Sequence, residues 1–119
     1  MLLAVAETVA ESRGSGTVMV GCGAVSELTR FATDPRWSVH APGHPAEVRR
    51  MILDAVRGGG RAYVHVSAES NAEPREAAEG FRIVREGRAG VALAVGAALD
   101  PVRRATADLD LTVLDGATI

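Results

Sequence analysis

Short apolar runs alternate with helix-forming segments along this chain, and glycine or proline stands at most of the boundaries between them. The runs that predict strands are residues 17–20, 37–40, 62–66, 91–95 and 111–114. Because parallel strands need a crossover segment between them, a repeated strand–helix–strand order is typical of parallel pairing. The sequence therefore predicts an α/β fold: a short, mainly parallel sheet with flanking helices, followed by a small β-α-β unit.

Helix-forming composition marks the segments between these runs. Residues 2–12 predict a first helix, and residues 26–32 predict a second one with Ser26 as its N-cap. A third helix is expected to open at Pro45 and to run to about Arg57, just before three glycines. Residues 101–107 predict a helix in the second unit, and residues 81–84 a further strand.

The length of the chain, 119 residues, limits how much core each part can build. We expect a first unit at residues 1–73, a linker at 74–89 and a second unit at 90–119. One β-α-β piece cannot cover both faces of its strands, whereas parallel strands are normally covered on both. We therefore expect the region after Phe81 to lie at or near a contact with another chain, with Leu93 and Val113 among its exposed apolar residues.

Composition excludes several function classes. The formal charge is −2, so the chain lacks the basic balance of a nucleic-acid-binding protein. No apolar run reaches the roughly 20 residues that span a bilayer, so no membrane association is expected. Cys22 is the single cysteine, which rules out an internal disulfide and a cysteine-based zinc site and favours a cytoplasmic location.

The residues that could carry chemistry are few and scattered. His40 and His44 flank a Pro-Gly loop, where a four-residue spacing does not bring two imidazoles together, so packing is favoured over metal binding. His65 falls in the middle of a predicted strand, and Cys22 lies between two glycines, where a small buried residue is favoured over a nucleophile.

Charged residues also favour structural roles. We expect the arginine pairs at 49–50 and 103–104 to be solvated, together with the charged stretch that contains Glu73, Arg75, Glu76 and Glu79. We assign no catalytic, cofactor-binding or metal-ligating residue from the sequence.

Several stretches, in this order and spacing, resemble the transketolase family from about residue 17 to the end. They cover the end of its pyrimidine-binding domain and the start of its C-terminal domain. The stretches are PRWSVHAPGHPAEV (35–48), AVRGGG (55–60), YVHVS (63–67), VREG (84–87), VALAVG (91–96), LDPV (99–102) and LTVL (111–114).

The resemblance implies a relative of thiamine diphosphate enzymes that transfer a two-carbon ketol unit between sugar phosphates. It also implies losses, because the family's diphosphate-binding domain and activating glutamate have no counterpart in this sequence. A histidine-bearing loop of the family is replaced by Ala24 and Val25. The arginine that grips phosphate in many members falls at Ala68, and Glu69 beside it would repel a phosphate.

Two functions stay open at this stage. The chain is either a transketolase-like subunit or fragment that contributes structure to a ketol transferase, or a non-enzymatic protein-interaction module derived from a transketolase. In both, the chain alone is expected to bind no cofactor, and thiamine diphosphate with magnesium would be held only in a complex. The expected partner is a second copy or another transketolase-like chain.

Overall fold

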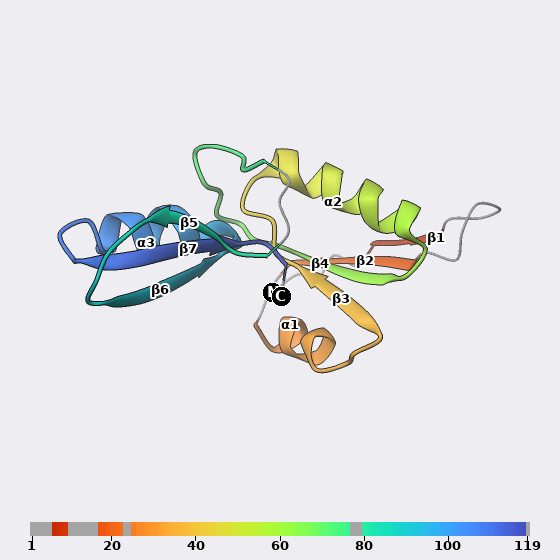
Figure 1. Ribbon diagram of the computed structural model, residues 1–119. Coiled ribbons are helices and arrows are strands. Elements are labelled where there is room, and N and C mark those ends of the chain that lie inside the picture. The colour runs from red at the N-terminus through yellow and green to blue at the C-terminus, as the bar shows by residue number, and fades with distance from the viewer. Residues whose placement is uncertain (1–5, 10–16, 23–24, 77–79, 119) are drawn as a thin grey trace.

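The computed structural model describes residues 6–9, 17–22, 25–76 and 80–118, which form two sheets with helices on their faces (Figure 1). The first sheet has the order β1-β2-β4-β3. Its parallel part consists of β2 (Thr17–Cys22), β4 (Arg61–Val66) and β3 (Trp37–His40), with β4 between the other two. The predicted α/β fold, with a short and mainly parallel sheet, is therefore confirmed.

The prediction of a helix over residues 2–12 is wrong where the structure describes that segment. Ala6–Val9 forms strand β1, which pairs antiparallel with β2 from Ala6 opposite Val20 to Val9 opposite Thr17. The outer edge of β2 offers unpaired backbone groups, and pairing with them outweighs a modest helix preference. The remaining residues of that predicted helix lie outside the described part of the chain.

Helices α1 (Val25–Ala32) and α2 (Pro45–Gly58) cover opposite faces of the first sheet (Figure 1). The bounds of α2 follow from local chemistry. His44 is its N-cap and Pro45 its first residue, while Gly59 ends it in a left-handed conformation with φ of 76°. The crossovers through α1 and α2 carry the chain from β2 to β3 and from β3 back to the central strand β4.

Aromatic rings fill the space between α1 and the sheet. The ring of Phe31 stacks on Tyr63 at a centroid distance of 4.3 Å, and Trp37 meets Phe31 edge-on at 4.8 Å. Tyr63 in turn lies against Gly21, where a Cβ atom would come within 2.5 Å of the phenol oxygen. The chain thus places three of its few aromatic residues in one small cluster.

The second sheet has the order β5-β7-β6. Strands β6 (Gly90–Val95) and β7 (Leu111–Gly116) are parallel and joined through a short 3-10 turn and helix α3 (Leu99–Ala105). The predicted β-α-β unit is confirmed, and β5 (Arg82–Arg85) adds an antiparallel strand to it. Its core is small and consists of Ala94, Leu99 and Val113, with Val84, Ala92 and Val102 packed against it.

Candidate functional site

A pocket of about 340 Å³ lies where β3 and β4 end, beside the N-terminus of α2. We call it the carboxyl-edge pocket, because ligands of α/β proteins usually bind at the carboxyl ends of parallel strands. Its wall is mainly apolar, and its polar groups come from His44, Ser67, Glu69 and Ser70. Pro42, Pro45, Val48, Val66 and Ala68 complete the lining.

The polar groups of the carboxyl-edge pocket are largely engaged by the neighbouring backbone. His44 Nδ1 accepts a hydrogen bond from the Ala46 amide at 3.1 Å, and the His44 carbonyl accepts one from the Glu47 amide at 2.9 Å. Ser67 Oγ accepts from the Glu69 amide at 3.1 Å. The N-terminal amides of α2 are therefore occupied, and the lining contributes no lysine or arginine that could bind an anion.

The sequence indicated that His40 and His44 are not brought together, and in the structure each histidine contacts its own set of neighbours. His40 Nδ1 and Nε2 lie 3.1 Å from Thr118 Oγ1 and from Ser38 Oγ, and burial lowers the pKa of this imidazole. His65 lies on the strand beside Tyr63, whose hydroxyl is 3.2 Å from Nδ1, and burial lowers its pKa too. Among the described residues, no three His, Cys, Asp or Glu side chains are grouped to hold a metal ion.

A buried ionic cluster joins the first sheet to the second, and the sequence analysis missed it. Arg75 and Asp115 have side chains that are 4% and 0% exposed, and Arg75 Nε lies 2.7 Å from Asp115 Oδ2. The two atoms form an ion pair, but the Nε–H group does not point at the carboxylate oxygen well enough to make a hydrogen bond. Arg82 Nε approaches the same oxygen at 3.3 Å from β5. The expectation that Arg75 is solvated is therefore wrong.

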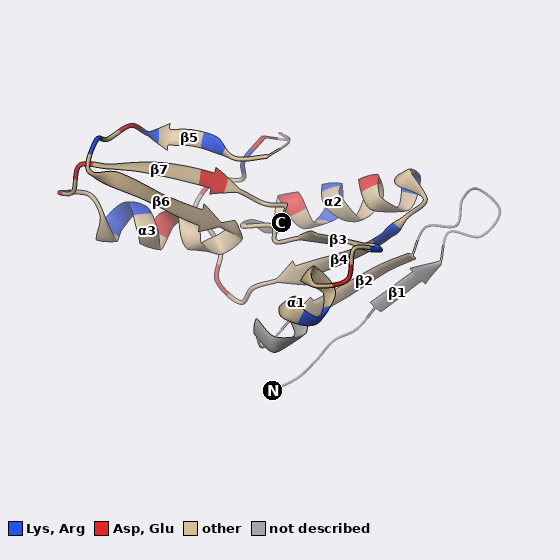
Figure 2. Cartoon of the chain, turned by 60° about the horizontal axis from the view of Figure 1, so that its bottom comes forward, with Lys and Arg blue, Asp and Glu red and all other residues tan. Residues whose placement is uncertain are grey.

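Helix α2 takes part in the same cluster. Glu47 is fully buried, and its Oε2 accepts a hydrogen bond from the Arg75 amide at 3.3 Å. Arg50 Nη1 donates to the Arg75 carbonyl at 3.2 Å, so Arg50 is held in place, whereas Arg49 is exposed as predicted. Figure 2 shows charged residues of both signs on α2, basic ones on β5 and an acidic one in β7.

Asn71 forms a second link between the two sheets. It is 4% exposed, its Nδ2 donates to the Gly96 carbonyl at 2.9 Å, and its Oδ1 accepts from the Asp100 amide at 3.0 Å. Its own amide donates to the Gly43 carbonyl at 2.8 Å. Gly96, at φ of 60°, lies so close to Ala41 that a Cβ atom would come within 2.6 Å of that carbonyl oxygen. We call Asn71 and the ionic cluster together the junction between the two sheets.

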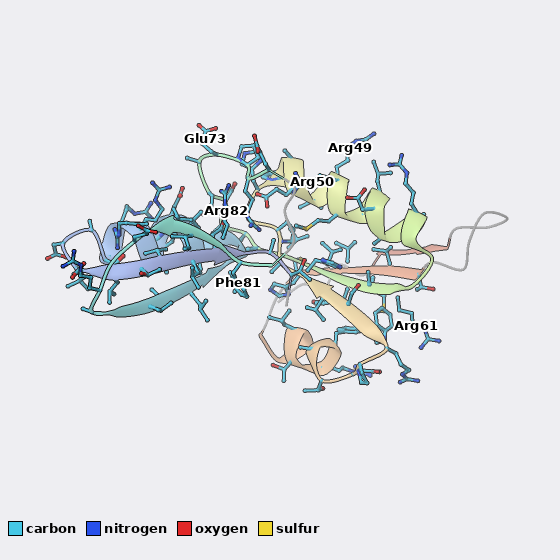
Figure 3. All side chains as sticks on the ribbon, in the orientation of Figure 1. Arg49, Arg50, Arg61, Glu73, Phe81 and Arg82 are labelled. Atoms are coloured by element: carbon cyan, nitrogen blue, oxygen red, sulfur yellow. The ribbon has the colours of Figure 1, made fainter. Side chains whose placement is uncertain are left out.

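The face of the second sheet opposite α3 is uncovered within the described chain. Its large apolar residues are Phe81, Ile83, Val91 and Leu93, which are 46%, 58%, 63% and 60% exposed. We call these four residues the open face. Figure 3 shows Phe81 and Arg82 on opposite sides of the sheet, as expected for neighbouring strand residues.

Strand register decides which apolar residues belong to the open face. Leu93 pairs with Leu114, and Ala92 pairs with Val113 on the side of α3. The expectation of exposure is confirmed for Leu93, but it is wrong for Val113, which is 0% exposed.

Comparison with known proteins supports the fold assignment. A split-gene transketolase, described as an inactive tetramer of four beta subunits, superposes on this chain with a TM-score of 0.65 and 19% sequence identity. The match covers 86% of this chain and 39% of that one. The chain has a transketolase-like α/β fold. At this level of identity the likeness concerns the fold alone.

One relative is similar in sequence. It is an uncharacterized 33.6 kDa protein in the fasciation locus of Rhodococcoides fascians, 38% identical over 118 residues. The match covers 87% of this chain but only 38% of the relative, so the chain spans well under half the length of this relative and of the split-gene transketolase. No family model matches the chain. None of the described helices is long and apolar enough to cross a membrane.

Proposed function

We propose that this chain is a structural component of a thiamine diphosphate-dependent ketol transferase that is assembled from several chains in the cytoplasm. The observation that carries this proposal is the fold: the described strands and helices superpose on a split-gene transketolase over most of this chain. In such an assembly the chain supplies the end of a pyrimidine-binding domain and the start of a C-terminal domain. The other chains supply the cofactor site and the reacting groups.

The cofactor is assigned to the partner chains because the residues here do not fit it. A diphosphate with magnesium needs carboxylate oxygens for the metal and either cations or unpaired amides for the phosphates. The carboxyl-edge pocket has one carboxylate, Glu69, no lysine or arginine, and helix amides that His44 already satisfies.

The test is to purify the full chain from its own source, identify what accompanies it, and titrate thiamine diphosphate with magnesium into each preparation. We expect the pure chain to give no binding heat. We expect a complex that contains a chain with a diphosphate-binding domain to bind the cofactor and to transfer a ketol unit. Micromolar binding by the pure chain, or purification without any such partner, would contradict the proposal.

A second function, a non-enzymatic interaction module, is favoured by one observation. The open face exposes four large apolar side chains on a folded sheet, which is typical of a surface that binds another protein. If this function is correct, the chain binds its partner equally well with and without thiamine diphosphate, and the complex has no ketol transferase activity.

A further inference from the structure

We propose that two copies of this chain associate through their open faces, with the sheets packed face to face. This proposal names one partner for the assembly proposed above. It rests on the proposed function only for the statement that the chain is part of an assembly. The contact itself is derived from the second sheet. Strands β6 and β7 are parallel, and parallel strands are covered on both faces in stable proteins, whereas α3 covers one face only.

The area of the open face matches a dimer contact. A fully exposed side chain of this size presents about 150–200 Å² to solvent. Multiplied by the four exposed fractions, this value gives about 400 Å² of apolar surface on the open face. Apolar atoms make up roughly 56–65% of a protein interface, so this surface corresponds to about 600–700 Å² on each partner. Stable interfaces bury about 1,200–2,000 Å² in total, or about 600–1,000 Å² on each partner, so the open face reaches the lower end of this range.

The shape of the open face suits packing against its own copy. Ile83 on β5 and Leu93 on β6 both pair with Leu114 on the central strand β7, so the three side chains form an apolar row across the sheet. Two sheets packed in this way lie about 10 Å apart with their side chains interdigitated. At one end Phe81 lies over Gly116, where a Cβ atom would come within 2.5 Å of the ring.

Charge at the other end of the sheet favours a second copy over a strongly charged partner. A hollow of about 420 Å³ lies there beside Ile83, and its charged lining residues are Glu86, Arg88 and Asp110. A two-fold axis along the strands brings the two hollows together, and each hollow contains both signs of charge, so neither copy presents a charge of one sign only. The net charge of −2 adds little repulsion between copies.

The experiment is sedimentation equilibrium of the pure full chain, from low to high micromolar concentration, without cofactor. We expect a reversible dimer of the 12.4 kDa chain. Leu93→Asp should raise the dimer dissociation constant by about 100-fold, because a two-fold interface contains the substitution twice. The matched control is Leu53→Asp, which puts the same charge on a partly exposed leucine of helix α2 in the first unit, and it should leave the constant unchanged.

Each outcome bears on the proposal. A folded monomer at high micromolar concentration overturns it, and so does a dimer that Leu93→Asp and Leu53→Asp weaken equally. If circular dichroism shows that Leu93→Asp does not fold, Ile83→Ser and Leu93→Ser replace it with smaller polar groups, and a dimer that survives both overturns the proposal. The sedimentation experiment contains no cofactor and no second protein, so a monomeric result does not contradict the multi-chain transferase proposal. In the same way, cofactor binding by the pure chain contradicts the transferase proposal but not the dimer.

Discussion

Replacing Asn71 by alanine tests whether the junction between the sheets stabilises the whole chain. The substitution removes the hydrogen bonds to Gly96 and Asp100, each with a net contribution of about 1 kcal/mol. The Gly96 carbonyl still accepts a hydrogen bond from the Leu99 amide, so the substitution does not leave it unpaired. We therefore expect the free energy of unfolding to fall by about 1–3 kcal/mol, a large share of the total for a domain of this size.

Urea denaturation followed with two probes makes the test specific. Trp37 is the single tryptophan and lies on β3, so its fluorescence reports the first sheet, whereas far-UV circular dichroism reports both sheets. In the wild type we expect coincident transitions. In Asn71→Ala we expect the circular dichroism transition to begin at lower urea than the fluorescence transition, because the second sheet has the smaller core.

Two further variants separate the hydrogen bonds from general effects of substitution. Ser70→Ala is the control, because Ser70 is exposed and its single bond is to the Asn71 carbonyl, so the loss should stay under about 0.5 kcal/mol. Asn71→Asp keeps the acceptor for Asp100 but places an oxygen against the Gly96 carbonyl, so it should destabilise at least as much as alanine at neutral pH. A loss below about 0.5 kcal/mol for Asn71→Ala would refute the reasoning.

Three other predictions follow from single contacts and are checked by the same denaturation measurement. Arg75→Met should cost about 1.5–3 kcal/mol, because the buried Asp115 loses its closest cation but keeps Arg82 Nε at 3.3 Å; a cost near zero would show that Arg75 does not stabilise this carboxylate. Burial lowers the pKa of His40, so the unfolded chain binds more protons; stability should fall as pH drops below about 6.5, and His40→Gln should reduce this pH dependence. Gly96→Ala should cost about 1–3 kcal/mol or more, because of its positive φ and the close Ala41 carbonyl, whereas Gly58→Ala meets open space and should be neutral or stabilising.

The parallel strands of the first sheet were predictable because their signal is local. Each is a short apolar run bounded by turn residues, and Val18, Val39 and Val64 are the buried residues that such runs supply. Strand β1 was not predictable in the same way, since its residues favour a helix and the free edge of β2 decides their conformation. The capping of α2 by His44 was also beyond the sequence reasoning, which considered that histidine only as a metal ligand or a packing residue.

The junction was not predictable because its partners are far apart in the sequence. Arg75 stands in a stretch of charged residues, which normally indicates a solvated surface, and its partner Asp115 follows 40 positions later. Only the tertiary structure shows that Glu47 is buried beneath the same segment. The exposure of Leu93 and the burial of Val113 likewise depend on strand register, which the apolar composition of the two runs does not determine.

We infer that the ionic cluster, unlike Asn71, acts on orientation more than on net stability. Burying Arg75 and Asp115 costs desolvation energy that ion pairs often only balance, and apolar residues of similar size would pack at least as well. Charged groups, unlike apolar ones, satisfy each other only in a narrow range of geometries, so the cluster and Asn71 fix how the second sheet lies against the first. The open face therefore has a fixed position relative to the carboxyl-edge pocket. In an assembly built from several chains this matters more than a few kcal/mol of stability, because a partner bound at the open face is then held at a fixed position relative to the pocket.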